Sequence, residues 1–309
     1  MKKILFIIGI IVVLSIYSNL GISKKAINNS QKIKVETTLF PLFDFVKNIG
    51  QSKVDVSLLL PPNVEPHSFE PKPGDILRIN ESDLFVYTSK FMEPWANDII
   101  EGISGKNIKV VDASAGIEFM KKENNEHNHQ KNGYDPHIWL DFANAQKMID
   151  NIASALAAKD FNNANFYKKN ASTFKKELSQ VDEAYKNKLS KCRNKEFIYS
   201  GHYAFGYLAK RYGLTYNSVY GVSPDSEPKA KQVAKLVAKI KKDRIKYIFY
   251  EELLSPEMAN MLAIESGVKL LPLNPAHNLT REDYKNGKTY LSIMEDNLKN
   301  LTAGLGCNN

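Results

Sequence analysis

Short apolar runs alternate with amphipathic segments through the first half of the chain. The apolar runs are strand-like and lie at 33–38, 54–60, 84–88 and 108–111. Segments with apolar residues at helical spacing lie at 43–49, 73–79, 95–100 and 144–158. Strands that alternate with helices are typical of parallel βαβ units. The pattern therefore predicts a βα lobe over residues 33–160.

The second half repeats this alternation after one long helical segment. Residues 162–190 carry apolar side chains at helical spacing among many lysines and glutamates, and they include no glycine or proline. At 1.5 Å per residue this helix would be roughly 40 Å long, enough to reach along both halves. We predict an α/β fold in which two βα, Rossmann-like lobes, 33–160 and 194–309, are joined by a single long rigid helix at 162–190.

The first residues have the pattern of an export signal. Two lysines precede an apolar run at 4–16. A basic start and a run of this length fit a secretory signal, and the run is shorter than the ~20 residues of an ordinary membrane span. We interpret 1–22 as a signal peptide or an N-terminal anchor of an exported protein. A lipid anchor needs a cysteine just after the run, but Tyr17 stands there and the first cysteine is Cys192.

Charge and cysteine content exclude further classes of protein. The formal net charge is +8, but the lysines are spread along the chain without an arginine-rich block, so we expect no nucleic-acid binding. The two cysteines, Cys192 and Cys307, are too few for a disulfide scaffold or a cysteine-rich zinc site. In an exported protein they could pair across the second lobe, and two free thiols are the alternative.

A polar insert at 121–133 interrupts the first half. It lacks core residues and holds His127 and His129, two of the six histidines. Its composition predicts a mobile loop. The two histidines could capture metal ions in an accessory role, and a loop without such a role fits equally well.

The other four histidines are His67, His137, His202 and His277, which lie 65 to 75 residues apart. Each lies just beyond or beside a predicted strand end. Ligands of open α/β sheets bind outside the carboxyl ends of the strands, so the four side chains could converge from separate loops. Imidazole nitrogen suits zinc and other transition metals. The spacing thus suggests a metal site, although each histidine alone is more typical of an ordinary surface or core residue.

Several carboxylates lie near these histidines in the sequence. Glu65 and Asp135 each stand two residues before a histidine, and Glu251 and Glu252 end a predicted strand. A carboxylate beside a metal site accepts the second imidazole N–H and holds the ring in one tautomer, or it serves as a ligand itself. We expect one of the two glutamates and Asp135 to act in this way. Solvated loops or helix caps are the alternative.

Five segments of the chain resemble one protein family. They read TLFPLFDF at 38–45, LPPNVEPHSFEP at 60–71, DPHIWLD at 135–141, SGHYAFGYLA at 200–209 and GVSPDSEP at 221–228. Together they are similar to the cluster A-I solute-binding proteins of zinc and manganese ABC transporters, over essentially the whole chain after the export signal. The resemblance implies two βα lobes joined by a long helix, with one metal ion in the cleft between the lobes.

The same resemblance implies which residues hold the metal. It makes His67, His137 and His202 ligands, while the fourth ligand of the family varies among a carboxylate, a histidine and water. We expect His277 in that place, because the loop at 273–278 contains no carboxylate. Position 202 is His where manganese-type members have Glu, which also favours zinc. The insert at 121–133 resembles the variable histidine-rich loop of zinc-type members.

The function implied is that of an extracytoplasmic high-affinity receptor that delivers Zn²⁺ to an ABC-transporter permease. A manganese receptor of the same transporter class and a surface adhesin with the same fold are the alternatives. We expect no catalytic residues, because His-Glu-x-x-His is absent and the histidines come from four distant loops. We expect a monomer that binds one divalent ion.

Overall fold

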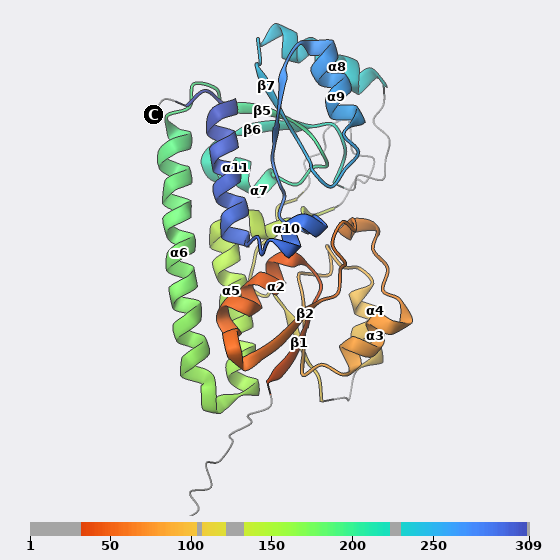
Figure 1. Ribbon diagram of the computed structural model, residues 1–309, viewed down its shortest axis with the longest axis vertical. Coiled ribbons are helices and arrows are strands. Elements are labelled where there is room, and N and C mark those ends of the chain that lie inside the picture. The colour runs from red at the N-terminus through yellow and green to blue at the C-terminus, as the bar shows by residue number, and fades with distance from the viewer. Residues whose placement is uncertain (1–31, 104–106, 122–132, 223–229, 308–309) are drawn as a thin grey trace, which may run out of the picture. The chain divides into compact units, whose positions relative to one another are not determined.

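Two four-stranded parallel sheets form the framework of the computed structural model, which describes residues 32–103, 107–121, 133–222 and 230–307 (Figure 1). The first sheet has the order β2-β1-β3-β4 and the second the order β6-β5-β7-β8. The two sheets have the same topology, because in each of them the first strand along the chain lies between the second and the third, and the fourth lies beside the third. The strands are β1 Ile33–Thr37, β2 Val54–Leu58, β3 Leu84–Tyr87, β4 Lys109–Asp112, β5 Glu196–Ser200, β6 Thr215–Ser218, β7 Tyr247–Tyr250 and β8 Lys269–Pro272. The predicted α/β fold with two βα lobes is confirmed.

The first sheet is covered by helices on both faces. Along β3, Leu84 and Val86 belong to the core that includes α2 (Phe40–Gly50), whereas Phe85 packs on the opposite face with α3 (Pro73–Asn80) and α4 (Ala96–Gly102). Successive side chains of a strand point to opposite faces, and both sets are apolar here. This explains the unbroken apolar run of β3, which predicts a buried parallel strand.

The second sheet follows the same rule. Phe197 and Tyr199 of β5 face the large core, and Ile198 faces the smaller core under α8 and α9. The helices of this lobe are α7 Gly206–Tyr212, α8 Ala230–Lys242, α9 Glu257–Ser266, α10 Arg281–Lys285 and α11 Tyr290–Gly304. The alternation predicted for this half is confirmed, and α10 is a short helix that the hydrophobic pattern does not predict.

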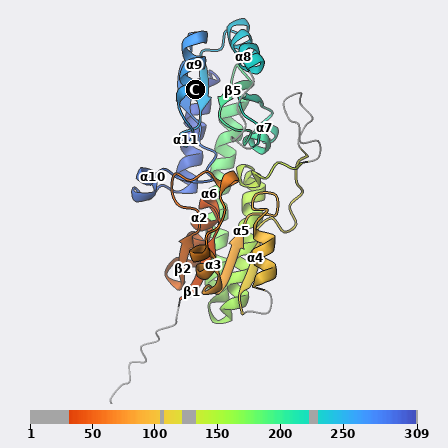
Figure 2. The same ribbon diagram turned by 90° about the vertical axis from the view of Figure 1, so that its right-hand side faces the viewer.

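Two helices, α5 (Phe142–Lys159) and α6 (Ala164–Ser190), connect the sheets. A 3-10 turn at Phe161–Asn163 separates them, so the long helix begins two residues later than expected. α6 packs on α2 and α5 of the first lobe and on α7 and α11 of the second (Figures 1 and 2). Its buried residues follow at intervals of three or four, which forms one apolar seam. The exact lobe limits at 160 and 194 stay a prediction.

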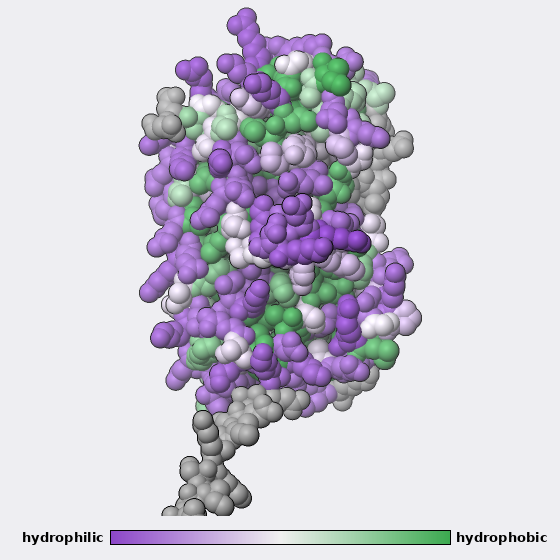
Figure 3. Space-filling view, in the orientation of Figure 1, coloured by the Kyte–Doolittle hydropathy of each residue, from purple (hydrophilic) through white to green (hydrophobic). Residues whose placement is uncertain are grey.

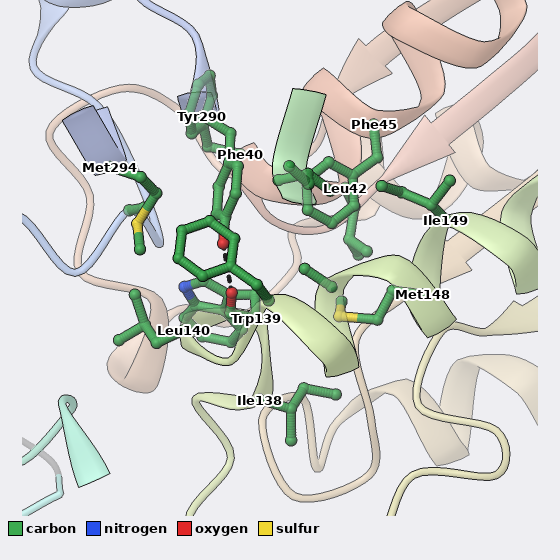
Figure 4. Close-up of a cluster of buried hydrophobic side chains, with 14 of the residues drawn as sticks. Phe40, Leu42, Phe45, Ile138, Trp139, Leu140, Met148, Ile149, Tyr290 and Met294 are labelled. Carbon is green, nitrogen blue, oxygen red and sulfur yellow. Dashed lines mark hydrogen bonds between the residues drawn. The ribbon is translucent and has the colours of Figure 1, made fainter. Parts of the chain in front are cut away.

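A continuous core joins the two lobes beside the histidines. Trp139 and Tyr290 are fully buried at its centre among the residues drawn in Figure 4. The Tyr290 hydroxyl donates to the Trp139 carbonyl oxygen at 2.5 Å, and the Trp139 indole N–H donates to the Pro275 carbonyl oxygen at 2.8 Å. Each bond crosses between segments of the two lobes. The segment after His137 is therefore held firmly by the second lobe.

Cys192 and Cys307 form a disulfide in the structure, at the ends of α6 and α11. The two residues are 115 positions apart. In the chain-entropy account, closing a loop of this size stabilises a folded domain by roughly 4 to 5 kcal/mol, because it restricts the unfolded chain. The bond would thus fix the ends of the two helices that flank the second lobe.

The face of the molecule that Figure 3 shows is mainly hydrophilic. Hydrophilic residues cover most of the face in Figure 3, and hydrophobic residues form separate small patches between them. Among the described helices, none combines the length and the apolar character needed to cross a membrane. The segment 1–22, His127, His129 and most of the motif at 221–228 lie outside the described residues.

Candidate metal centre

His67 is placed by a tight turn that follows β2. Val64 N–H donates to the Pro61 carbonyl oxygen at 3.2 Å, and Asn63 has a φ of 68°. A β-turn with proline second and a left-handed asparagine third is the pattern of a type II turn. Glu65 then caps the short helix Pro66–Ser68 by accepting the His67 backbone N–H at 3.1 Å. Turn and cap together set the direction of the His67 side chain.

His137 is held by the carboxylate two residues before it. Asp135 Oδ1 accepts both the His137 backbone N–H at 3.0 Å and the ring Nδ1–H at 2.8 Å. The 3-10 helix Ile138–Leu140 follows directly and anchors Trp139 in the core. His137 is fully buried. Its ring is therefore fixed from both sides along the chain.

His202 and its carboxylate come from neighbouring strands. β5 ends at Ser200 and β7 at Tyr250, and these two residues are partners in the sheet. Two residues after Ser200, His202 donates its Nδ1–H to Glu251 Oε2 at 2.8 Å, and its backbone N–H lies 3.2 Å from the same oxygen. Gly201 is required between them, since a Cβ there would lie 2.6 Å from Glu251 Oε2.

His277 enters from the loop after β8. Ala276, just before it, has a left-handed φ of 58°, and its N–H donates to Asn274 Oδ1 at 2.8 Å. The His277 ring is fully buried, and neither of its nitrogens has a hydrogen-bond partner among the described residues. Nε2 lies 3.7 Å from Glu251 Oε1 and 3.9 Å from Glu65 Oε2. A buried imidazole without hydrogen bonds is costly, so it needs another partner.

The ring nitrogens of three histidines lie close together. Nε2 of His137 lies 3.1 Å from Nε2 of His67 and 3.1 Å from Nε2 of His202. Four nitrogens around zinc at 2.0–2.1 Å lie about 3.3 Å from one another in a tetrahedron. The observed separations are close to the edges of that tetrahedron.

The tautomers of these rings favour a cation between them. Because the Nδ1–H groups of His137 and His202 face the carboxylates of Asp135 and Glu251, the neutral rings carry their lone pairs on Nε2. Two lone pairs at 3.1 Å repel each other unless a cation lies between them. The histidine cluster could therefore hold a metal ion, and a second donor group overlaps it at His202, Glu251 and His277.

The pKa values of two imidazoles shift in opposite directions, because charge opposes burial at His202 and adds to it at His277. Burial by itself lowers the pKa of His202, but the adjacent Glu251 carboxylate outweighs it and raises that pKa above the ordinary 6.5. Burial, followed by the charges of the other three histidines, lowers the pKa of His277 well below 6.5. His277 therefore stays neutral and able to donate a lone pair where His202 begins to bind a proton.

The structure decides which of the two adjacent glutamates, Glu251 or Glu252, lies beside the histidines. Glu251 is buried at the cluster, whereas Glu252 is exposed and accepts an amide hydrogen of Asn274 at 3.4 Å.

Sequence reasoning missed the glycines that make room for the carboxylates. A Cβ on Gly206, at the start of α7, would lie 2.5 Å from Asp135 Oδ2. Glycines inside a histidine-bearing motif are the signal that could have identified them.

Comparison with known proteins agrees with this geometry. The model of the family described as zinc-uptake complex component A, periplasmic, matches residues 35–304. The chain is 38% identical over 285 residues to the high-affinity zinc uptake system protein ZnuA of Bacillus subtilis (strain 168). The matched region covers 90% of this chain and 89% of that protein. It is 36% identical to the zinc-binding lipoprotein AdcA of Streptococcus pneumoniae, covers 55% of that protein, and so spans about half its length.

Solved structures give the same picture. The Zn(II)-bound ZnuA-like domain of Streptococcus pneumoniae AdcA has a TM-score of 0.77 and 35% identity, with 89% of this chain and 99% of that chain covered. The laminin-binding protein Lmb of Streptococcus agalactiae, described as bifunctional with adhesin and metal transporting activity, has a TM-score of 0.79 and 33% identity, with coverage of 89% and 100%. The resemblance to metal-binding solute-binding proteins is confirmed, and the chain belongs to the family of the periplasmic component A of zinc-uptake complexes.

Proposed function

We propose that this protein is an extracytoplasmic receptor that binds one Zn²⁺ with high affinity and delivers it to an ABC-transporter permease. The observation that carries the proposal is the position of His137 Nε2, which lies 3.1 Å from Nε2 of His67 and 3.1 Å from Nε2 of His202, while Nδ1 of His137 and of His202 faces a carboxylate. The zinc-binding names of its relatives support zinc as the cargo. No chemical step is part of this role, so the protein would act without catalysis.

His67, His137 and His202 would bind the ion through Nε2, and His277 would complete the set. Neutral imidazoles leave the double charge of the ion uncompensated, so nearby carboxylates matter. Asp135 and Glu251 would offset that charge while they hold their histidines in the required tautomer. Nitrogen donors also favour zinc over manganese, which prefers oxygen.

The direct test is a competition titration of the apo-protein, residues 32–309, with zinc and manganese against a calibrated chelator. We expect one zinc per chain with a dissociation constant at or below ~1 nM, and much weaker manganese binding. Tight manganese with weak zinc would instead indicate a manganese receptor. If neither metal binds tightly, the receptor proposal fails and adhesion, the activity also described for Lmb, becomes the leading function.

Alanine at position 277 tests the fourth ligand. If His277 binds the ion, His277→Ala should weaken zinc binding by roughly 10- to 100-fold, because three imidazoles remain. A cobalt-loaded sample should also change its visible spectrum as water replaces the imidazole. An unchanged dissociation constant and spectrum would assign the fourth position to Glu65, Glu251 or water. Leu77→Ala, which changes an exposed residue of α3 that is no proposed ligand, is the control.

Zinc affinity should fall as the solution becomes acidic, because binding requires neutral imidazole. The raised pKa of His202 places the start of this loss above pH 6.5, whereas His277, with its lowered pKa, does not contribute there. Glu251→Gln should move the start to lower pH, since it removes the carboxylate charge. Dissociation constants measured from about pH 8 to about pH 5 for both proteins test this, and a pH-independent affinity would contradict it.

The remaining features of the proposal concern location and delivery. We infer that 1–22 directs export and is either removed or kept as an anchor, in keeping with the periplasmic family and the lipoprotein relatives. His127 and His129 would capture zinc weakly near the site. A monomer would suffice for delivery, because all four proposed ligands come from one chain.

A further inference from the structure

We propose that Asn278 is a positioning residue that holds the His67-bearing turn against the His277-bearing loop and thereby slows the release of zinc. The inference rests on the proposed receptor function. It concerns the rate at which the ion leaves, and it assigns Asn278 no direct contact with the ion. Asn278 is fully buried although its side chain is polar.

The side chain of Asn278 joins two loops that are far apart in the sequence. Its amide nitrogen donates to the carbonyl oxygens of Pro61 and Val64, both at 2.8 Å. These two residues begin and end the turn that leads into Glu65 and His67. One amide group is therefore hydrogen-bonded to both ends of the turn.

The hydrogen bonds of Asn278 fix the orientation of its amide. Oδ1 accepts the backbone N–H of Leu279 at 2.8 Å, so the nitrogen must point to the turn. Both amide hydrogens and the amide oxygen are then used. Aspartate has the same shape but offers only acceptors, so it would place an oxygen against the carbonyl oxygens of Pro61 and Val64.

Further hydrogen bonds join the turn at 61–64 to the loop that bears His277, and we call this contact between the two loops the junction. Asn63 N–H donates to the Leu279 carbonyl oxygen at 2.9 Å, and Arg281 N–H donates to Asn63 Oδ1 at 3.2 Å. The turn on one side and Ala276 on the other contain left-handed residues, which persist only where their surroundings hold them. The charged helix α10 follows at once and forms the dark purple area in the middle of Figure 3.

Burial indicates why this junction would control release. His137, His202 and His277 are fully buried, whereas His67 is only half-buried. An ion that leaves the cluster would therefore pass most readily on the side of His67, after that side chain moves. The turn at Pro61–Val64 precedes His67 by only a few residues, so a turn held by Asn278 resists this movement.

The chain offers a matched control for the experiment. Asn151 of α5 also donates its amide nitrogen to two carbonyl oxygens of one loop, those of Ala113 and Ala115, both at 2.9 Å. It holds no segment that bears a proposed ligand. Asn278→Asp and Asn278→Ala are compared with Asn151→Asp and Asn151→Ala, so that the general effect of losing such an amide is measured separately.

Two measurements decide the proposal. Zinc-loaded proteins are mixed with excess chelator, and we expect at least ~10-fold faster dissociation from the Asn278 variants than from wild type and from the Asn151 variants. A negative charge would by itself retain a cation more strongly, so faster release from Asn278→Asp would come from the lost donation and the oxygen–oxygen contacts that replace it, and not from the charge. In the apo-protein, backbone amides of residues 61–69 should exchange with solvent faster in the Asn278 variants.

The outcomes separate this inference from the receptor proposal. If wild type holds zinc but neither Asn278 variant releases it faster than its Asn151 counterpart, the inference is wrong and the receptor function stands. Unchanged amide exchange at 61–69 overturns it as well, without reference to zinc. If wild type binds no zinc, the receptor function fails, and the role in release fails with it.

Discussion

His137→Ala should weaken zinc binding by at least ~1000-fold, or about 4 kcal/mol. Nε2 of His137 is the atom that lies 3.1 Å from both other imidazole nitrogens, so its loss breaks the centre of the donor set. The substitution also leaves Asp135 without the imidazole N–H that it accepts at 2.8 Å. The carboxylate would then turn toward other partners, and His67 and His202 would each lose a ring that packs against them.

The measurement is the chelator competition titration used for wild type. Thermal unfolding of the apo-protein is recorded beside it, to show that the variant is folded. Leu77→Ala serves as the control and should retain wild-type affinity, because Leu77 is an exposed residue of α3 and is no proposed ligand. A His137→Ala protein that binds zinc within ~10-fold of wild type would rule out His137 as a ligand.

Trp139→Ala should lower the free energy of unfolding of the apo-protein by about 3 to 5 kcal/mol. The side chain is fully buried in the core that joins the lobes (Figure 4). Its removal leaves a large cavity and also leaves the Pro275 carbonyl oxygen without the indole N–H. Zinc affinity should fall too, because Trp139 anchors the segment that carries His137.

Urea unfolding of the apo-protein gives the free energy, and the dependence on urea concentration shows whether the compactness of either state has changed. Leu77→Ala is the control, since Leu77 is 62% exposed on α3 and should change stability by less than ~0.5 kcal/mol. A loss below about 1 kcal/mol for Trp139→Ala would mean that the core between the lobes contributes little to folding.

Much of the fold could be predicted from the sequence because its signals are local. A strand buried on both faces needs an unbroken apolar run, and 84–87 shows it. A helix that packs along one side needs apolar residues every three or four positions, and 162–190 shows that as well. Parallel strands bring their carboxyl ends to one edge of a sheet, which is why histidines after different strands could be expected to meet.

Other parts of the site have no local signal. Glu251 and Glu252 are adjacent and chemically identical, and only the pairing of β5 with β7 decides which one faces His202. Asn278 contacts Pro61 and Val64 across more than 200 residues, and no pattern near Asn278 indicates it. The short helix α10 is too brief and too polar for its periodicity to stand out.

The sequence by itself determined the chemistry of the site, which is four imidazoles and the carboxylates near them. His67, His202 and His277 follow strands β2, β5 and β8 as expected, whereas His137 was expected beside a strand end and lies well beyond β4, just before a 3-10 helix. Tertiary structure alone decided the geometry. It placed Nε2 of His137 3.1 Å from that of His202 and aimed the Nδ1 atoms of both at carboxylates. The physical reason is that a donor type belongs to a residue, whereas distances and tautomers depend on contacts between segments that the chain keeps far apart.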